Sequence, residues 1–441
     1  MHKTLTLLIS GLLLAGTVQA ADLVSVYRDA VGYDAAFAAA RASLDAGRER
    51  LPQGRAGLLP NLSVAANTVW NDTDITPRTT PKSTSSFNYN SNGWTATLSQ
   101  PLFRWQNWAT YKQGEYGVAQ AEAQFVAARQ DLILRVAQAY FDVLLAQETL
   151  SVSRAQKTAI AEQLESAKRN FEVGTATITD THEAQARFDL AMATEIAAES
   201  DLAVKRQTLR TIAGNDPESL KTLRPGAQIG RPQPDDLAKW AETAETGNAN
   251  VMQAEAGLRI AEQEVSKQRA GHLPTLDLVA TYGKSGAGYS SLAAGNGMDM
   301  TNRTVGVQLA VPLFAGGYVM SKTTEAVALR EKAVADLDNA RRQAALVARQ
   351  AYLGVTSGLS QVKAYEAAVV SSQASLDSNK LGYEVGVRIN IDVLNAQSQL
   401  YDTRQKLMKA RLDTLVAQLR LKAAAGNLAD DDLAAINALL E

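Results

Sequence analysis

The chain of 441 residues contains no cysteine. It therefore offers no disulfide, no thiolate metal ligand, no thiol nucleophile and no amino-terminal cysteine for a lipid anchor. Aromatic residues are also scarce, at 6%, which favours long, closely packed helices over bulky globular cores. The formal net charge of −2 gives no reason to expect nucleic acid or an anionic membrane surface as a partner.

Long apolar runs are missing after the start of the chain. The first residues have a basic start at His2 and Lys3, an apolar run over 5–15 and a small-residue cleavage site that ends at Ala20. This pattern predicts a secretory signal peptide over residues 1–20 and an exported mature protein. No later segment has about eighteen consecutive apolar residues, which excludes a helical inner-membrane protein. Transmembrane strands are shorter and only alternately apolar, so the composition is compatible with them.

The chain does contain an internal tandem repeat, with copies about 210 residues apart. Three landmarks return in the same order: a Leu-Pro step, a Pro-Leu-Phe step and a Val-Gly turn. A repeat of this size indicates one structural unit that is used twice. The paired landmarks are Pro60 and Pro274, Pro101 and Pro312, and Gly174 and Gly386.

The landmarks divide the mature chain into two repeats, 21–212 and 235–426. A proline-rich linker over 213–234 joins them, and a short segment over 427–441 follows. Each repeat reads as a helix, a strand hairpin, a long helix, a tip turn and a return helix. The hairpins are predicted over 60–103 and 274–313, and the tip turns over 172–178 and 384–390.

The hairpins show apolar residues at every second position, most cleanly at Val305, Val307 and Leu309. Lipid on one side and water on the other would demand this alternation. A half-buried hairpin of a soluble protein fits the strands equally well. Segments rich in Ser, Asn and Gly, between Trp70 and Trp94 and over 283–303, are predicted as exposed loops.

The stretches 107–171 and 318–383 contain no proline. Each predicts a helix of about 65 residues and roughly 100 Å. The return helix of the second copy carries a heptad pattern from Ile391 to Leu419, which is typical of coiled coils. Four strands alone would leave backbone groups unpaired in hydrocarbon, so further copies of the chain must close the sheet into a ring.

These landmarks resemble the TolC family of trimeric outer-membrane export channels, over essentially the whole mature chain. The resemblance implies a membrane α+β fold: a twelve-stranded outer-membrane β-barrel, four strands from each chain of a homotrimer, continued by an α-helical coiled-coil tunnel in the periplasm of a Gram-negative bacterium. It also implies a passive duct for efflux or type I secretion, reached through a periplasmic adaptor, energised by an inner-membrane transporter and embedded in outer-membrane lipid. The resemblance implies no cofactor, metal or enzymatic activity. The cargo, drug or protein, is set mainly by the inner-membrane partner.

The resemblance places the periplasmic entrance constriction on Asp392 and Asn395. Asn395 departs from the family's second carboxylate, and one ring of carboxylates gives a weaker cation preference than two. The implied gate network has four members, Tyr383 and Arg388 facing Thr179 and Asp180. The alternative is that Asp180 and Asp392 cap the helices that start there, and a cap leaves other carboxylate acceptor sites available.

The Val-Gly tips are the surface that the resemblance assigns to the adaptor, while Gly174 and Gly386 are also expected at left-handed turn positions. The adaptor-contact residues are Val173, Gly174, Thr175, Val385, Gly386 and Val387.

Two other classes of protein are weighed against a channel. A soluble periplasmic coiled-coil adaptor or scaffold explains the helices but not the apolar face of both hairpins. A secreted hydrolase would need a nucleophile and base, and none can be named. His182 and His272 lie on different elements and have no partner at metal-ligand spacing.

Overall fold

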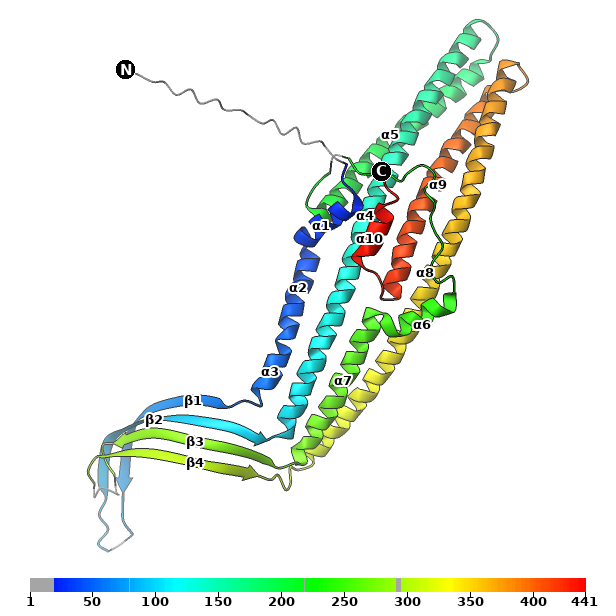
Figure 1. Ribbon diagram of the computed structural model, residues 1–441. Helices are drawn as coiled ribbons and strands as arrows, with labels where there is room; N and C mark the ends of the chain where they lie inside the picture. The colour runs from blue at the N-terminus through cyan, green and yellow to red at the C-terminus, as the bar shows by residue number, and fades with distance from the viewer. Residues whose placement is uncertain (1–19, 79, 218, 291–294) are drawn as a thin grey trace, which may run out of the picture. The chain divides into compact units, whose positions relative to one another are not determined.

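The computed structural model describes residues 20–78, 80–217, 219–290 and 295–441 (Figure 1). The predicted signal peptide therefore lies outside the described residues except for Ala20. The chain divides into two compact units. We call Ala39–Ala128 with Glu242–Leu346 the sheet unit. Residues Met1–Ala38, Arg129–Ala241 and Val347–Glu441 are called the tip unit.

The sheet unit contains one antiparallel sheet in the order β1-β2-β3-β4. Each copy of the repeat supplies one hairpin, and the β2–β3 pair joins the copies, for example where Leu98 lies opposite Ala280. The four strands predicted from the sequence are thus confirmed. They are β1 (Asn61–Ile75), β2 (Ser85–Phe103), β3 (Thr275–Ala287) and β4 (Met298–Ala310).

The strands extend further than the sequence predicted. Most of the loop predicted between Trp70 and Trp94 is strand, and strands also occupy both ends of the loop predicted over 283–303. Polar side chains bond across the ladder here, as where Asn90 Nδ2 donates to Thr68 Oγ1 at 2.9 Å. A strand that is exposed on both faces needs no apolar alternation, so periodicity did not reveal these parts.

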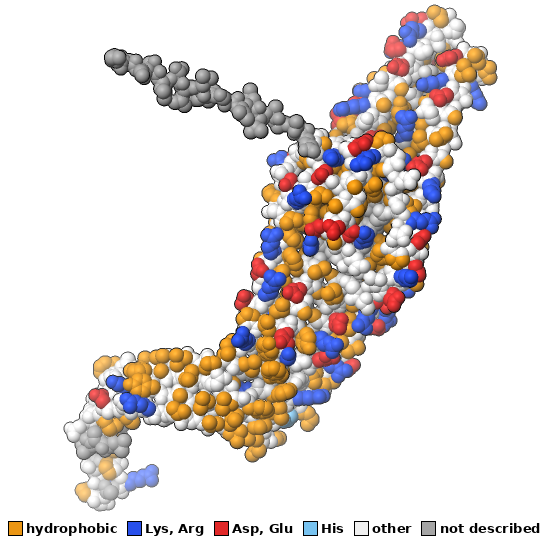
Figure 2. Space-filling view, viewed as in Figure 1, with side chains coloured by type: hydrophobic (Ala, Val, Ile, Leu, Met, Phe, Trp, Pro, Cys, Tyr) orange, Lys and Arg blue, Asp and Glu red, His pale blue; other side chains and the backbone are white. Residues whose placement is uncertain are grey.

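The apolar residues of the sheet are exposed. Val305 is 78% exposed, Leu62 69% and Leu309 64%, and Figure 2 shows hydrophobic side chains crowded on the visible face of the strands. A soluble hairpin would bury these side chains in a core, so that alternative does not describe this sheet. In the described part of the chain, the outer edges of β1 and β4 have no strand partner.

An ion pair ties the sheet to the first long helix, α4 (Trp105–Glu172). Arg104 donates from Nε to Asp277 Oδ1 at 2.8 Å and from Nη2 to Oδ2 at 2.6 Å. Asp277 is buried in β3, and a two-pronged guanidinium–carboxylate pair fixes both direction and distance. The matching residue of copy two is Ala315, so copy two has no arginine at this position.

The long helices predicted over 107–171 and 318–383 are confirmed as α4 and α8 (Tyr318–Glu384). The return helices are α5 (Ile178–Ala213) and α9 (Asn390–Ala424). Helix α9 buries Val393 and Leu400 in addition to the heptad residue Leu394, so its packed face is wider than the predicted stripe. None of the described helices has a stretch long and apolar enough to cross a bilayer.

Shorter helices precede each hairpin and follow α9. The predicted helical segment over 22–57 is broken where Asp34 and Glu49 each precede a new helix. The short elements are α1 (Leu23–Tyr33), α2 (Ala35–Arg48), α3 (Arg50–Ala56), α6 (Leu237–Gly247), α7 (Ala249–Arg269), the 3-10 turn η1 (Ala270–His272) and α10 (Asp430–Asn437).

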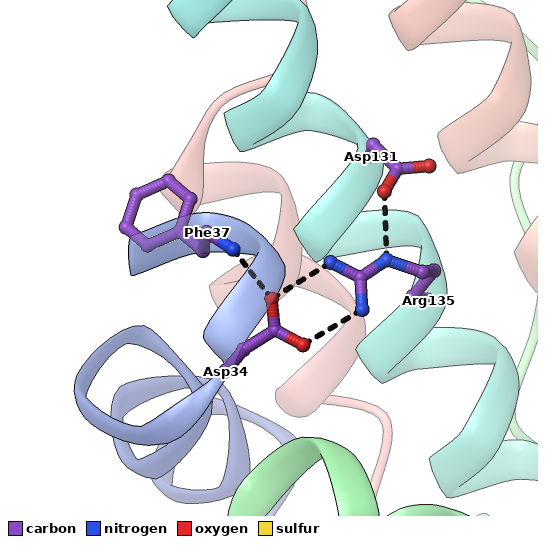
Figure 3. A network of polar contacts seen from close by, with 4 residues as sticks. All are labelled: Asp34, Phe37, Asp131 and Arg135. Atoms are coloured by element: carbon purple, nitrogen blue, oxygen red, sulfur yellow. Dashed lines mark hydrogen bonds and ion pairs between the residues drawn. The ribbon is translucent and has the colours of Figure 1, made fainter. Parts of the chain in front are cut away.

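A buried ion pair holds the start of α2 to α4 within the tip unit (Figure 3). Arg135 donates from Nη1 and Nη2 to the two carboxylate oxygens of Asp34, at 2.8 and 3.0 Å. The Phe37 amide donates to the same carboxylate at 2.7 Å. The hydrogen bonds from Arg135 hold the pKa of Asp34 below its usual range.

Candidate functional site

The tip unit contains two helix reversals, α4 to α5 and α8 to α9, with the same backbone geometry. Gly174 has a φ of 78° and Gly386 a φ of 77°, a left-handed conformation that glycine adopts without steric cost. In each turn, the carbonyl four residues before the glycine accepts from the amide just after it, at 2.8 Å. The predicted left-handed role of both glycines is confirmed.

Copy one starts its return helix with a capping box. The Thr177 hydroxyl accepts from the Asp180 amide at 3.3 Å, and Asp180 Oδ2 accepts from the Thr177 amide at 2.9 Å. These reciprocal bonds satisfy two amide groups that the helix itself cannot satisfy. The interpretation of Asp180 as a capping residue is therefore confirmed.

Copy two differs because Ile389 occupies the position before α9 and provides no side-chain cap. Asp392, in the first turn of α9, is half-buried, and its Oδ2 lies 3.6 Å from Arg388 Nη1. The cap predicted for Asp392 is wrong, because a reciprocal box needs a polar side chain before the helix.

The predicted gate residues have other partners within one chain. The Tyr383 hydroxyl accepts from Asn170 Nδ2 at 3.0 Å, which links α8 to α4, and Arg388 pairs with Asp392. Thr179 is exposed. Among the described residues, no hydrogen bond or ion pair joins Thr179 or Asp180 of copy one to Tyr383 or Arg388 of copy two.

Glycine leaves room for the Arg388 side chain at the end of α8. A Cβ on Gly382 would lie 2.7 Å from Arg388 Cγ, closer than real Cβ contacts. The Arg388 amide also donates to the Gly382 carbonyl at 3.0 Å. The turn therefore positions the guanidinium beside the first turn of α9.

The second predicted entrance residue, Asn395, contacts the other copy. Arg187 on α5 donates from Nη2 to Asn395 Oδ1 at 3.0 Å. Next to it, Leu394 packs in a buried cluster with Ile160 and Ala191, so apolar packing fixes the two helices at this height. The tip unit thus has a polar contact at the position of the predicted constriction.

Sequence reasoning missed several polar residues that link the copies. Arg187 lies seven residues after Asp180, on the same face of its helix, and this spacing could have indicated it. No local signal marks the others, because their partners lie on another helix. The missed residues are Asn170, Arg187, Gln163 and Asn390, the last two being joined by a hydrogen bond.

The six residues predicted to contact an adaptor are all exposed at the turns. Val387 is 79% exposed and Val173 72%. Exposed valines at a helix reversal leave apolar area uncovered within one chain. In the part of the chain that the structure describes, no group of three His, Cys, Asp or Glu side chains could hold a metal ion.

The family model described as outer membrane efflux protein matches residues 26–215 and again residues 240–427. The chain belongs to this family. The double match follows the internal repeat, with one matched segment for each copy.

Curated relatives of full length support the same family. Outer membrane protein TolC of Vibrio cholerae is 33% identical over 443 residues, covering 100% of this chain and 99% of the relative. TolC of Escherichia coli is 34% identical over 448 residues, covering 99% and 89%. The alkaline protease secretion protein AprF of Pseudomonas aeruginosa is 34% identical over 425 residues, covering 96% and 88%.

Solved structures show the same fold. The outer membrane protein VceC of Vibrio cholerae has a TM-score of 0.77 at 20% identity, covering 92% of this chain and 96% of that chain. The CmeC outer membrane channel of Campylobacter jejuni has a TM-score of 0.79 at 17% identity, covering 92% and 85%. This TolC-family chain is an outer-membrane channel protein for efflux and secretion, and the alternative of a soluble adaptor has no support.

Proposed function

We propose that three copies of this chain form the exit duct of a tripartite efflux pump or type I secretion system. The observation that carries the proposal is the open sheet, with unpaired outer edges and exposed valine and leucine side chains. Each unpaired backbone group costs several kcal/mol in hydrocarbon, so other chains complete the wall. Two chains would give about eight strands and a filled interior, whereas three give about twelve with room for a lumen.

The duct is passive in this proposal. Each repeat, 21–212 and 235–426, supplies one hairpin and one tip, and 213–234 forms the linker between them. A periplasmic adaptor binds the exposed tips, and an inner-membrane transporter supplies the energy. The names of relatives that secrete proteases or act in efflux support this assembly, and we assign no catalytic step to any residue.

We assign the gate and the periplasmic entrance of the duct to the tip unit. Asp392 and Asn395 line the constriction, and Arg388 with Tyr383 holds the copy-two hairpin in its closed position. The ion pair of Arg388 with Asp392 and the hydrogen bond that Asn170 donates to Tyr383 support this role. An exposed ion pair contributes about 0–1 kcal/mol and a hydrogen bond between neutral groups about 0.5–1.5 kcal/mol, enough to bias a gate without locking it. Contacts of Thr179 and Asp180 with a neighbouring chain complete the proposed network.

The assembly is tested by measuring the mass of the detergent-solubilised protein by light scattering and its conductance in planar bilayers. We expect a particle of three chains that opens in discrete steps. A single chain that stays in solution without detergent and conducts nothing would overturn the proposal.

The gate is tested with Arg388→Ser and Tyr383→Phe, each of which removes a partner of the described bonds. Both variants should raise single-channel conductance. Asp377→Asn, at an exposed position earlier on α8, is the matched control and should leave conductance unchanged. Equal conductance in all variants would remove these residues from the gate.

The adaptor surface is tested with Val387→Asp, which places a charge on the most exposed valine of the tips. Co-purification with the adaptor should fall while trimer mass and conductance stay unchanged. Undiminished co-purification would assign the adaptor to another surface.

A further inference from the structure

The contact between Arg187 and Asn395 places a fixed positive charge beside the proposed constriction. Arg187 Nη2 lies 3.0 Å from Asn395 Oδ1, and Arg187 as a whole residue is half-buried. Apolar packing fixes the position of Arg187. Ala191, one turn later on α5, packs against Leu394, the residue before Asn395. Arg187 has no ion-pair partner among the described residues, so no carboxylate neutralises it directly.

The net charge of the entrance also depends on the charged side chains in the first turns of α5 and α9. On α9, Asp392 is offset by Arg388 at 3.6 Å. On α5, Asp180 is bound into the capping box, and Glu183 is exposed one turn before Arg187. Arg187 thus adds a positive charge beside carboxylates that already have partners, apart from Glu183.

We propose that Arg187 is a further selectivity-determining residue of the entrance, which lowers its preference for cations and admits cargo that carries carboxylate or phosphate groups. The inference rests on the proposed function, in which Asp392 and Asn395 line the constriction. A guanidinium bound to an amide oxygen keeps its full charge and has donors left for an anionic group, which it binds in a two-pronged geometry. Three chains would present three such groups in one ring.

The contact also predicts how Asn395 behaves. A carboxylate at this position would form an ion pair with Arg187 and cancel the positive charge that Arg187 adds to the entrance. Asn395→Asp should therefore raise the cation-to-anion permeability ratio of the natural chain, as Arg187→Gln does.

The test is the reversal potential of the full trimer in planar bilayers under a potassium chloride gradient. Arg187→Gln should raise the cation-to-anion permeability ratio by about twofold or more, because a ring of charge is removed. Arg187→Lys keeps the charge and should retain the original ratio. Arg210→Gln, at an exposed position in the last turn of the same helix, is the matched control and should change nothing. Light scattering checks that each variant is still trimeric.

The outcomes separate the inference from the proposed function. If Asp392→Asn shifts the ratio and Arg187→Gln does not, the entrance stands and the role of Arg187 is wrong. If neither variant shifts the ratio, the proposed constriction fails and the inference fails with it.

Discussion

The two copies of the repeat turn the chain with the same backbone and then use their carboxylates differently. Thr177 precedes α5, and its hydroxyl and amide form the capping box with Asp180. Ile389 stands at the matching place before α9 and offers no oxygen, so Asp392 faces Arg388 instead. Two differences, Thr177 against Ile389 and Ala176 against Arg388, thus separate a carboxylate that caps a helix from one that pairs with a cation.

The copies also differ at the start of a helix that lies before the hairpin in sequence, α2 in copy one and α7 in copy two. Asp34 precedes α2 and Asn248 precedes α7, and each accepts from a backbone amide of its helix. Asp34 also binds Arg135, whereas the matching stretch of α8 carries Leu346 and Val347. Copy one is therefore held by an ion pair at a site where copy two offers no arginine.

Removing that ion pair should give the largest effect. Arg135→Ala leaves the buried Asp34 carboxylate without its partner and should lower the free energy of unfolding by about 3–5 kcal/mol. Asn248→Ala, the copy-two counterpart, removes a cap and should cost about 1 kcal/mol. Urea unfolding of the detergent-solubilised protein measures both. Adding Asp34→Asn to Arg135→Ala should recover most of the loss, and failure to recover would show that charge is not the cause.

Acid should remove the same stabilisation selectively. The folded-state pKa of Asp34 lies below its usual value, so the stabilisation is fully present above the unfolded pKa of about 3.9. It is lost as the pH falls from there through the folded pKa. A pH series of melting temperatures should show this acid-side loss in the natural chain and a smaller one in Asp34→Asn. Parallel curves would contradict the assignment.

The caps of the return helices should give a smaller difference. Thr177→Ala removes the capping box and should destabilise the start of α5 by about 1 kcal/mol. Ile389→Ala removes no cap and should leave the exchange of the first α9 amides unchanged. Hydrogen exchange read at the two turns makes the comparison within one protein, and equal changes at both turns would refute it.

The smallest expected effect tests whether one residue converts copy two into copy one. Ile389→Thr supplies the missing hydroxyl, and the new box should stabilise the start of α9 by about 0.5–1 kcal/mol. Asp392 would then leave Arg388, so amide exchange at α9 should slow while conductance rises. Slower exchange at constant conductance would separate the cap from the gate.

Periodicity and repeated landmarks were enough to predict the long helices and four strands, because those elements follow from local spacing. The polar parts of β1 and β2 were predicted as loop, since side chains such as Asn90 are stabilised by partners on the next strand rather than by burial. A signal of that kind is visible only once the strands are paired.

The sequence predicted which residues the candidate site contains but not which hydrogen bonds and ion pairs they form. Asp180 and Asp392 both follow a Val-Gly turn, and the residues three and four positions before each one separate a cap from an ion pair: Thr177 and Ala176 in copy one, Ile389 and Arg388 in copy two. Arg187 went unnoticed because its partner, Asn395, lies on a helix from the other copy. Local sequence indicates which groups a helix presents, whereas the neighbouring helix decides what they bind.

The open edges of β1 and β4 have a kinetic consequence. If other chains must complete the sheet, the last stage of folding is an association between chains. Its rate then depends on the concentration of chains in the membrane. Dilution should slow maturation of the strands and leave the helical hairpins, which form from neighbouring segments, largely unaffected.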